Sequence, residues 1–290
     1  MPWYILPLIS ALIISVSTIL EKKVLVEEHA TEFSTVFAIF NAILCIPFAF
    51  LADFSLLSWE LVFIIFLGSV VATTSFLLTA KSTRHMDVSS TSSWMILAPA
   101  VTAVFAFFIL GEKLGSQQVF GIGLMLIGMY VLQSHQNSSV WDPLKEIYRS
   151  KYIHFIIISL FLYALGAMID RVSLSHLSVD FFAYVSLVHF FIAFNFFVIS
   201  YFLYDGTMGI KHGIKKYGWL ILLISVLTVA QRTTMALAIS TTMLGLILPI
   251  KRLSSLFTTI IGGELFHEKN LGRKIFACVV MLIGLVFMVV

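Results

Sequence analysis

Long runs of apolar residues, separated by short polar stretches, dominate this chain. A helix that crosses a membrane needs about 20 consecutive apolar residues. Strands of a membrane barrel alternate between polar and apolar residues and give a weaker pattern than these runs. The runs predict ten transmembrane helices, at residues 3–20, 33–52, 59–80, 88–110, 116–134, 152–173, 180–203, 217–238, 242–264 and 270–290. We therefore expect an all-α integral membrane protein.

The composition agrees with this pattern and excludes several other classes of protein. Hydrophobic residues make up 60% of the chain, charged residues only 11%, and the mean hydropathy is +1.02. A water-soluble domain of this length would carry far more charge. The net charge of +3 is spread over short loops, so we expect a lipid bilayer, and no nucleic acid, as the partner. No catalytic set of residues stands out, and Cys45 and Cys278 lie inside apolar runs, so we expect no enzyme, cofactor or metal site.

The two halves of the chain repeat each other at an offset of 156 residues. Glu112-Lys113 recurs as Glu268-Lys269, and Met125–Gly128 recurs as Met281–Gly284. Seven of the 24 positions from 111 to 134 are identical to their partners. Because five helices is an odd number, a second copy of five must enter the membrane from the opposite side. The pattern predicts two inverted five-helix repeats.

The domain organisation follows from this repeat. The first repeat covers residues 1–134 and the second covers residues 152–290. Between them, the stretch 135–151 is polar, contains Pro143 and carries charges of both signs, which is typical of a linker.

Two adjacent cations interrupt the ninth apolar run. Lys251 and Arg252 each cost roughly 2.5–3.5 kcal/mol at the centre of a membrane helix on insertion scales. On a helical wheel, Lys251 shares one side with Ser255, and Arg252 and Thr259 flank that side. This polar side must face the interior of the bundle, where we expect the four side chains to bind a substrate.

Two further residues are expected to join this site from neighbouring helices. Arg232, in the eighth apolar run, would add a third cation, and His189, midway along the seventh, would line the same cavity. The repeat places Met95 and Ile96 where the second half has its Lys-Arg pair. Cations in one half only favour an asymmetric, negatively charged ligand, because arginine binds phosphate or carboxylate oxygens two at a time.

The chain resembles a known family in its paired closing helices. Pro99, the run Leu110–Leu114, Gln118, Gly121 and Gly128 are similar to the EamA-type repeat of the drug/metabolite transporter superfamily. The second copy, from Phe266 to Gly284, is looser, with His267 where the family usually has glycine. This resemblance covers the whole chain and implies the fold. It leaves the substrate open, because the superfamily includes exporters of amino acids and drugs as well as carriers of sugar phosphates and nucleotide sugars.

The Lys251-Arg252 pair carries a more distant resemblance to the triose-phosphate/phosphate translocator branch of that superfamily. There the pair holds the substrate phosphate. This sequence has no lysine in the matching part of its fourth helix, where that branch has another phosphate ligand.

We therefore expect a secondary transporter in a cell membrane, inner or plasma. It would move a small organic anion that bears phosphate or carboxylate, by alternating access through a central cavity. Two alternatives remain: an exporter of amino acids or other zwitterionic or neutral metabolites, and a membrane partner that transports nothing.

The loops predict an orientation. Thirteen lysines and arginines lie in the connections after helices one, three, five, seven and nine. The positive-inside rule places these connections in the cytoplasm and both termini outside. Resemblance to many superfamily members implies termini inside, so both orientations remain open.

Overall fold

The computed structural model describes residues 4–55, 57–110, 114–134, 141–173, 179–203, 206–241 and 244–289. These residues form helices and connections and no strands. A 3₁₀ turn at Met95–Leu97 joins α4 to α5, and a π-helical turn at Thr258–Gly262 joins α11 to α12. The helices are α1 (Ile5–Glu27), α2 (Ala30–Leu51), α3 (Trp59–His85), α4 (Val88–Trp94), α5 (Ala98–Leu110), α6 (Ser116–Gln133), α7 (Asp142–Arg149), α8 (Lys151–Arg171), α9 (Phe181–Leu203), α10 (Gly206–Thr241), α11 (Leu244–Phe257), α12 (Gly263–Leu265) and α13 (Leu271–Val289).

The all-α, multi-pass class is confirmed. Nine helical segments among the described residues are long and apolar enough to cross a membrane. The predicted run 242–264 is not one of the nine: it contains α11, the π-helical turn, the start of α12 and three charged residues, Lys251, Arg252 and Glu264. The number of ten membrane crossings therefore stays a prediction. One helix was not predicted, since α7 lies inside the polar stretch 135–151.

Several helices extend beyond their predicted runs, most clearly α1 and α10. α1 continues past residue 20 to Glu27, because the Lys22 ammonium is satisfied by backbone carbonyls at the end of α3. It donates to Thr83 O at 2.6 Å and to Met86 O at 2.7 Å. α10 begins at Gly206, and its 36 residues measure about 54 Å along the helix axis. That exceeds a hydrocarbon core of about 30 Å, so one end of α10 reaches beyond it.

Large apolar side chains cover the outside of the bundle. Phe50 is 85% exposed, Trp59 89% and Trp219 79%. A soluble monomer rarely exposes many such side chains, whereas the hydrocarbon of a bilayer covers them without cost. Together with the nine apolar segments, these surfaces define an integral, multi-pass membrane protein.

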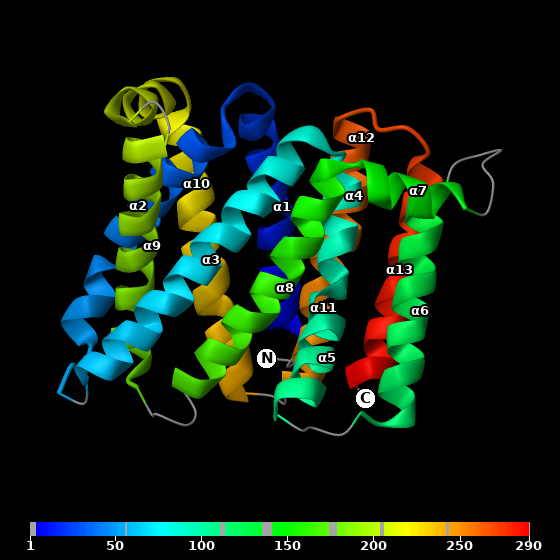
Figure 1. Ribbon diagram of the computed structural model, residues 1–290, viewed down its shortest axis with the longest axis horizontal. Coiled ribbons are helices and arrows are strands. Elements are labelled where there is room, and N and C mark those ends of the chain that lie inside the picture. The colour runs from blue at the N-terminus through cyan, green and yellow to red at the C-terminus, as the bar shows by residue number, and fades with distance from the viewer. Residues whose placement is uncertain are drawn as a thin grey trace.

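The helices run up and down between two ends of the bundle (Figure 1). We call one end the α7 end, because α7 lies across it, and the other the termini end, because α1 begins and α13 ends there. α1 runs from the termini end to the α7 end, while α8, the first long helix of the second half, runs the opposite way.

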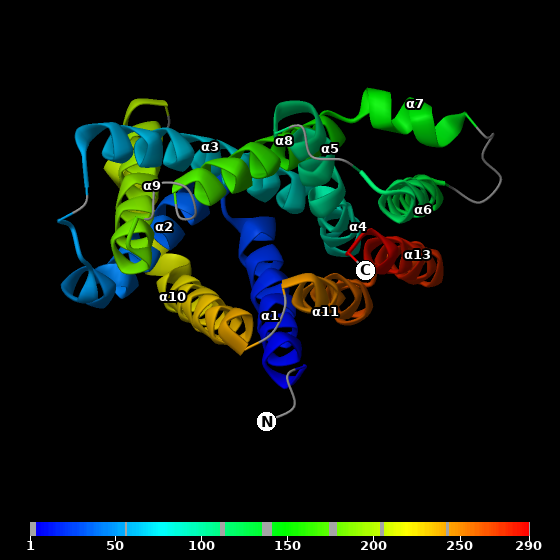
Figure 2. The ribbon, with the colours of Figure 1, turned by 90° about the horizontal axis from the view of Figure 1, so that it is seen from below.

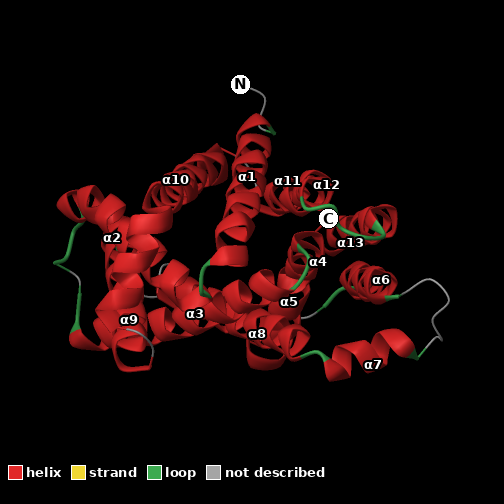
Figure 3. Ribbon diagram, turned by 90° about the horizontal axis from the view of Figure 1, so that it is seen from above, coloured by secondary structure: helices red, strands yellow, loops and turns green. Residues whose placement is uncertain are grey.

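The last long helix of each half packs against the other. α6 and α13 lie side by side (Figure 3) and form the most extensive contact between two helices of the described chain. Gly121, Gly128 and Gly284 lie in this contact, where backbone from the facing helix fills the space that a side chain would need. Small residues allow membrane helices to approach this closely.

Candidate functional site

The helices that carry the predicted cations stand on either side of α1. α1 lies between α10 and α11 (Figure 2) and packs against both. Two hydrogen bonds fix this arrangement: Gln231 Nε2 of α10 donates to Ser10 Oγ at 3.1 Å, and Thr258 Oγ1 donates to Ser15 Oγ at 3.2 Å. Arg232 therefore lies on the helix at one side of α1, and Lys251 and Arg252 lie on the helix at the other side.

Lys251 and Arg252 are half-buried and carry uncompensated charge. Neither makes a hydrogen bond or an ion pair in the part of the chain that the structure describes. Lys251 lies within electrostatic range of both Arg252 and Arg232. Partial burial removes some of the water around Lys251 and Arg252, and no described side chain replaces it as a partner. The three side chains are therefore suited to an anion that enters from solution.

His189 binds Arg232 directly. The ring is buried at 5% exposure, and its Nε2 accepts a hydrogen bond from Nη1 of Arg232. The other ring nitrogen, Nδ1, lies 2.8 Å from the carbonyl oxygen of Val185, one turn earlier on α9. Arg232 itself remains exposed. The structure thus joins two of the predicted site residues, on α9 and α10.

Two residues of α8, which the apolar runs and charges of the sequence did not indicate, belong to this region. Tyr163 lies within electrostatic range of Arg252 and Arg232, and Asp170 lies within electrostatic range of Arg232. Both side chains keep exposed surface, and their spacing of seven residues places them on one face of the helix. α8 packs mainly on α3 and α5, so these interactions cross the interior of the bundle. The spacing could have indicated them, since a tyrosine and an aspartate shared one face of an apolar helix.

Two carboxylates, Asp170 on α8 and Glu21 on α1, lie near these groups. Neither forms an ion pair with a cation of the site among the described residues. Asp170 Oδ1 accepts a hydrogen bond from the hydroxyl of Tyr184 on α9. Glu21 on α1 acts electrostatically on Tyr163 and makes no hydrogen bond or ion pair among the described residues. The site therefore has one negative group near Tyr163 and another near Arg232, in addition to its three cations.

The two predicted hydroxyl residues lie deeper. Ser255 and Thr259 are both buried. Thr259 Oγ1 donates to the carbonyl of Ser255 at 2.7 Å and lies 3.5 Å from Ser93 Oγ and from Ser89 O, on α4. In this arrangement the Thr259 hydroxyl joins α4 to the π-helical turn, and substrate contact by the two hydroxyls stays a prediction.

Charged side chains connect the helices at the α7 end. Lys274 Nζ of α13 lies 2.5 Å from Asp87 Oδ2 and 3.0 Å from Glu268 Oε2. Glu268 also accepts hydrogen bonds from the amide and the hydroxyl of Ser89. These contacts tie the start of α4, in the first half, to the connection before α13, in the second half. Glu268 belongs to the repeated Glu-Lys motif; its counterpart, Glu112-Lys113, lies outside the described residues.

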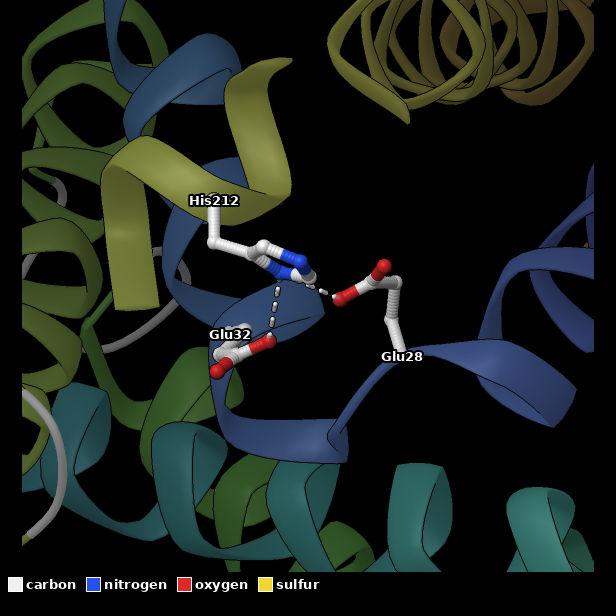
Figure 4. A group of neighbouring side chains, drawn as sticks. All are labelled: Glu28, Glu32 and His212. Atoms are coloured by element: carbon white, nitrogen blue, oxygen red, sulfur yellow. Dashed lines mark ion pairs between the residues drawn. The ribbon is translucent and has the colours of Figure 1, made fainter. Parts of the chain in front are cut away.

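A second charged group at this end consists of Glu28, Glu32 and His212 (Figure 4). Their potential ligand atoms all lie within 4.8 Å of one another, so their positions could suit a metal ion. Lys216 Nζ already lies 3.1 Å from Glu28 Oε1 and supplies positive charge there. An ion-pair network joining α1 and α2 to α10 accounts for this group. Its residues are distant in sequence, so spacing alone did not predict it.

The chain is similar to known proteins in its overall fold, and its first half matches a known family. Residues 1–133 match the EamA-like transporter family. A solved structure described as "Crystal structure of protein" is similar over 96% of this chain and 96% of its own, with a TM-score of 0.53 and 12% sequence identity. No curated protein matches the chain.

These matches support a multi-pass membrane protein whose first half is EamA-like. The structural likeness, at 12% identity, concerns the fold alone and covers both halves of the chain. Neither match bears on the triose-phosphate/phosphate translocator branch, so that resemblance at Lys251-Arg252 stays a prediction.

Proposed function

We propose that this protein is an EamA-type secondary transporter with ten transmembrane helices in two inverted repeats, situated in a cell membrane. Its substrate is a small organic anion bearing phosphate or carboxylate. The anion is bound by Lys251, Arg252 and Arg232 in a central cavity that opens to each side of the membrane in turn.

The lack of an ion-pair partner for the three cations among the described residues carries this proposal. Lys251 and Arg252 have no ion-pair partner in the described chain, and Arg232 donates to a histidine instead of a carboxylate. An anionic substrate would supply the missing charge. Guanidinium groups favour phosphate and carboxylate because they can donate two parallel hydrogen bonds to either.

Two features support alternating access between inverted repeats. Lys274, Asp87 and Glu268 link the two halves at the α7 end, as expected for a conformation closed on that side. The helix contacts between the halves are also reciprocal. A Cβ on Gly121 would meet the carbonyl of Gly284, and one on Gly128 would meet the carbonyl of Ala277. At the repeat offset of 156, Gly121 corresponds to Ala277 and Gly128 to Gly284, so exchanging the halves exchanges the contacts.

A second candidate function is the transport of a zwitterion such as an amino acid. Glu21 and Asp170 favour a zwitterionic substrate. Both carboxylates lie within electrostatic range of groups of the same site, and neither is ion-paired to a cation there. In that case the carboxylate of the substrate would bind the cations and its ammonium group would approach one of these acids.

A thermal-shift screen of the purified protein would test the proposal. Inorganic phosphate, organic phosphates, carboxylates and amino acids would be compared at equal ionic strength. A ligand that binds only the folded protein stabilises it by about 2.7 kcal/mol at 100 times its dissociation constant. We expect phosphates or carboxylates to raise the melting temperature. A rise with amino acids alone would favour the zwitterion transporter, and no counterflow of any of these compounds in sealed vesicles would favour a membrane partner without transport.

The charge of the loops predicts the orientation. The connections at the α7 end carry most of the lysines and arginines outside the apolar helices. We therefore expect the α7 end in the cytoplasm and both termini outside. A reporter that is active only in the cytoplasm, fused after Val290, should stay silent, while one inserted in the polar stretch 135–140 should be active. The opposite result would establish the termini-inside orientation.

A further inference from the structure

The hydrogen bond between Arg232 and His189 determines which ring nitrogen carries the hydrogen. A guanidinium group has donors only, so Nε2 of His189 must be the acceptor and cannot be protonated. Nδ1 then carries the hydrogen and donates it to the carbonyl oxygen of Val185, at 2.8 Å. In this arrangement the imidazole is neutral, with both nitrogens satisfied.

A neutral acceptor restrains the arginine without cancelling its charge. A carboxylate in the place of His189 would pair with the guanidinium and remove the charge that an anion needs. Asp170, whose charge acts on Arg232, is bound by Tyr184 and makes no ion pair with it. The guanidinium therefore keeps a full charge while one of its nitrogens is fixed.

The two side chains differ in access to the site. His189 is 5% exposed and sits between its own helix and Arg232, whereas Arg232 keeps exposed surface. A solute in the cavity would meet the guanidinium, and the ring would lie behind it. Such an arrangement is familiar from metal sites, where a hydrogen bond to the far side of a ligand orients it.

We propose that His189 is a positioning residue, which orients Arg232 toward the bound anion and does not itself contact the substrate. This inference rests on the proposed function of the cationic site. A free arginine must give up the motion of its long side chain on binding, and this loss weakens affinity. By holding Arg232 in advance, the neutral ring removes part of that cost. Its loss should weaken anion binding by about three- to tenfold, the effect expected for one side chain that is no longer restrained.

A double-mutant cycle tests whether His189 acts through Arg232. The full chain and the variants His189→Leu, His189→Gln, Arg232→Gln and His189→Leu/Arg232→Gln would be titrated with inorganic phosphate, and the dissociation constants compared. We expect His189→Leu to weaken binding three- to tenfold and His189→Gln, which keeps an acceptor, to restore most of it. In the Arg232→Gln background, His189→Leu should have no further effect. Equal losses in both backgrounds would show that His189 contacts the anion itself and would overturn the inference.

The tautomer of His189 gives a second test that needs neither ligand nor a folded leucine variant. Nitrogen-15 NMR of histidine-labelled protein in lipid would report the ring state, with the resonance assigned by its loss in His189→Gln. We expect a neutral ring protonated at Nδ1. A ring protonated at Nε2, or a cationic ring, could not accept from Arg232 and would overturn the inference. If phosphate fails to bind wild-type protein, that result counts against the proposed function, while the tautomer still decides the hydrogen bond.

Discussion

Replacing Lys251 by methionine or Arg252 by glutamine should abolish transport and leave the protein folded in the membrane. Each change removes a positive charge from a group that has no partner in the described chain. A hydrogen bond to a charged group contributes about 1.5–3 kcal/mol, so each variant should weaken anion binding by roughly 10- to 100-fold. Uptake or counterflow of a labelled organic phosphate or carboxylate, measured in proteoliposomes, would show the loss.

Stability provides the internal control for this prediction. If the two cations served the fold, their loss would lower the melting temperature. Since they are half-buried without compensation, we expect the melting temperature of the ligand-free variants to stay level or rise. Lys215→Met removes an exposed charge at the start of α10 and should change neither transport nor stability. Uptake at the wild-type rate in both site variants would rule out anion binding at this position.

The fold class could be predicted because each membrane helix corresponds to its own apolar run in the sequence. A run of about 20 apolar residues has few structures available to it other than a membrane helix. The ends of the helices were harder, since they depend on partners elsewhere in the chain. α1 continues through Lys22, whose ammonium group donates hydrogen bonds to carbonyls of α3 and of the turn after it. No local pattern around Lys22 contains that information.

The site was predictable to a similar extent. Lys251 and Arg252 could be selected because a charge within an apolar run is costly, and this cost is visible in one segment alone. The partner of Arg232 could not be derived in the same way. His189 lies on another helix, and only the packing of α9 against α10 brings the ring to the guanidinium. The spacing of Tyr163 and Asp170 places them on one face of α8, but only the packing of the bundle shows that this face lies within electrostatic range of the cations.

A leucine at Gly284 should be among the most destabilising single substitutions in this protein. A Cβ at this position would lie 2.6 Å from the carbonyl oxygen of Gly121 and 2.9 Å from the amide nitrogen of Met125. Both atoms belong to the backbone of α6, so no side-chain rotation can make room and the two helices must separate. Overpacking of this kind costs about 1–3 kcal/mol, and occasionally more. Thermal unfolding in detergent would measure the loss as a lower melting temperature.

Gly123, on α6, supplies the matched control. A Cβ there would meet nothing within 4 Å, so Gly123→Leu should leave stability unchanged or raise it, because leucine favours a helix more than glycine does. A similar fall in both variants would show that glycine is needed for some reason other than close packing.

The same interface can test the inverted repeat. Gly128 is the counterpart of Gly284 at the offset of 156, and a Cβ on it would lie 2.9 Å from the carbonyl oxygen of Ala277. If α6 and α13 are related by exchange of the two halves, the Gly121–Gly284 and Gly128–Ala277 contacts are two copies of one contact. Gly128→Leu should then lower the melting temperature about as much as Gly284→Leu. Tolerance of leucine at only one of the two positions would mean that the duplicated glycines no longer share one role. The repeat would then be present in the sequence and not in the packing of α6 against α13.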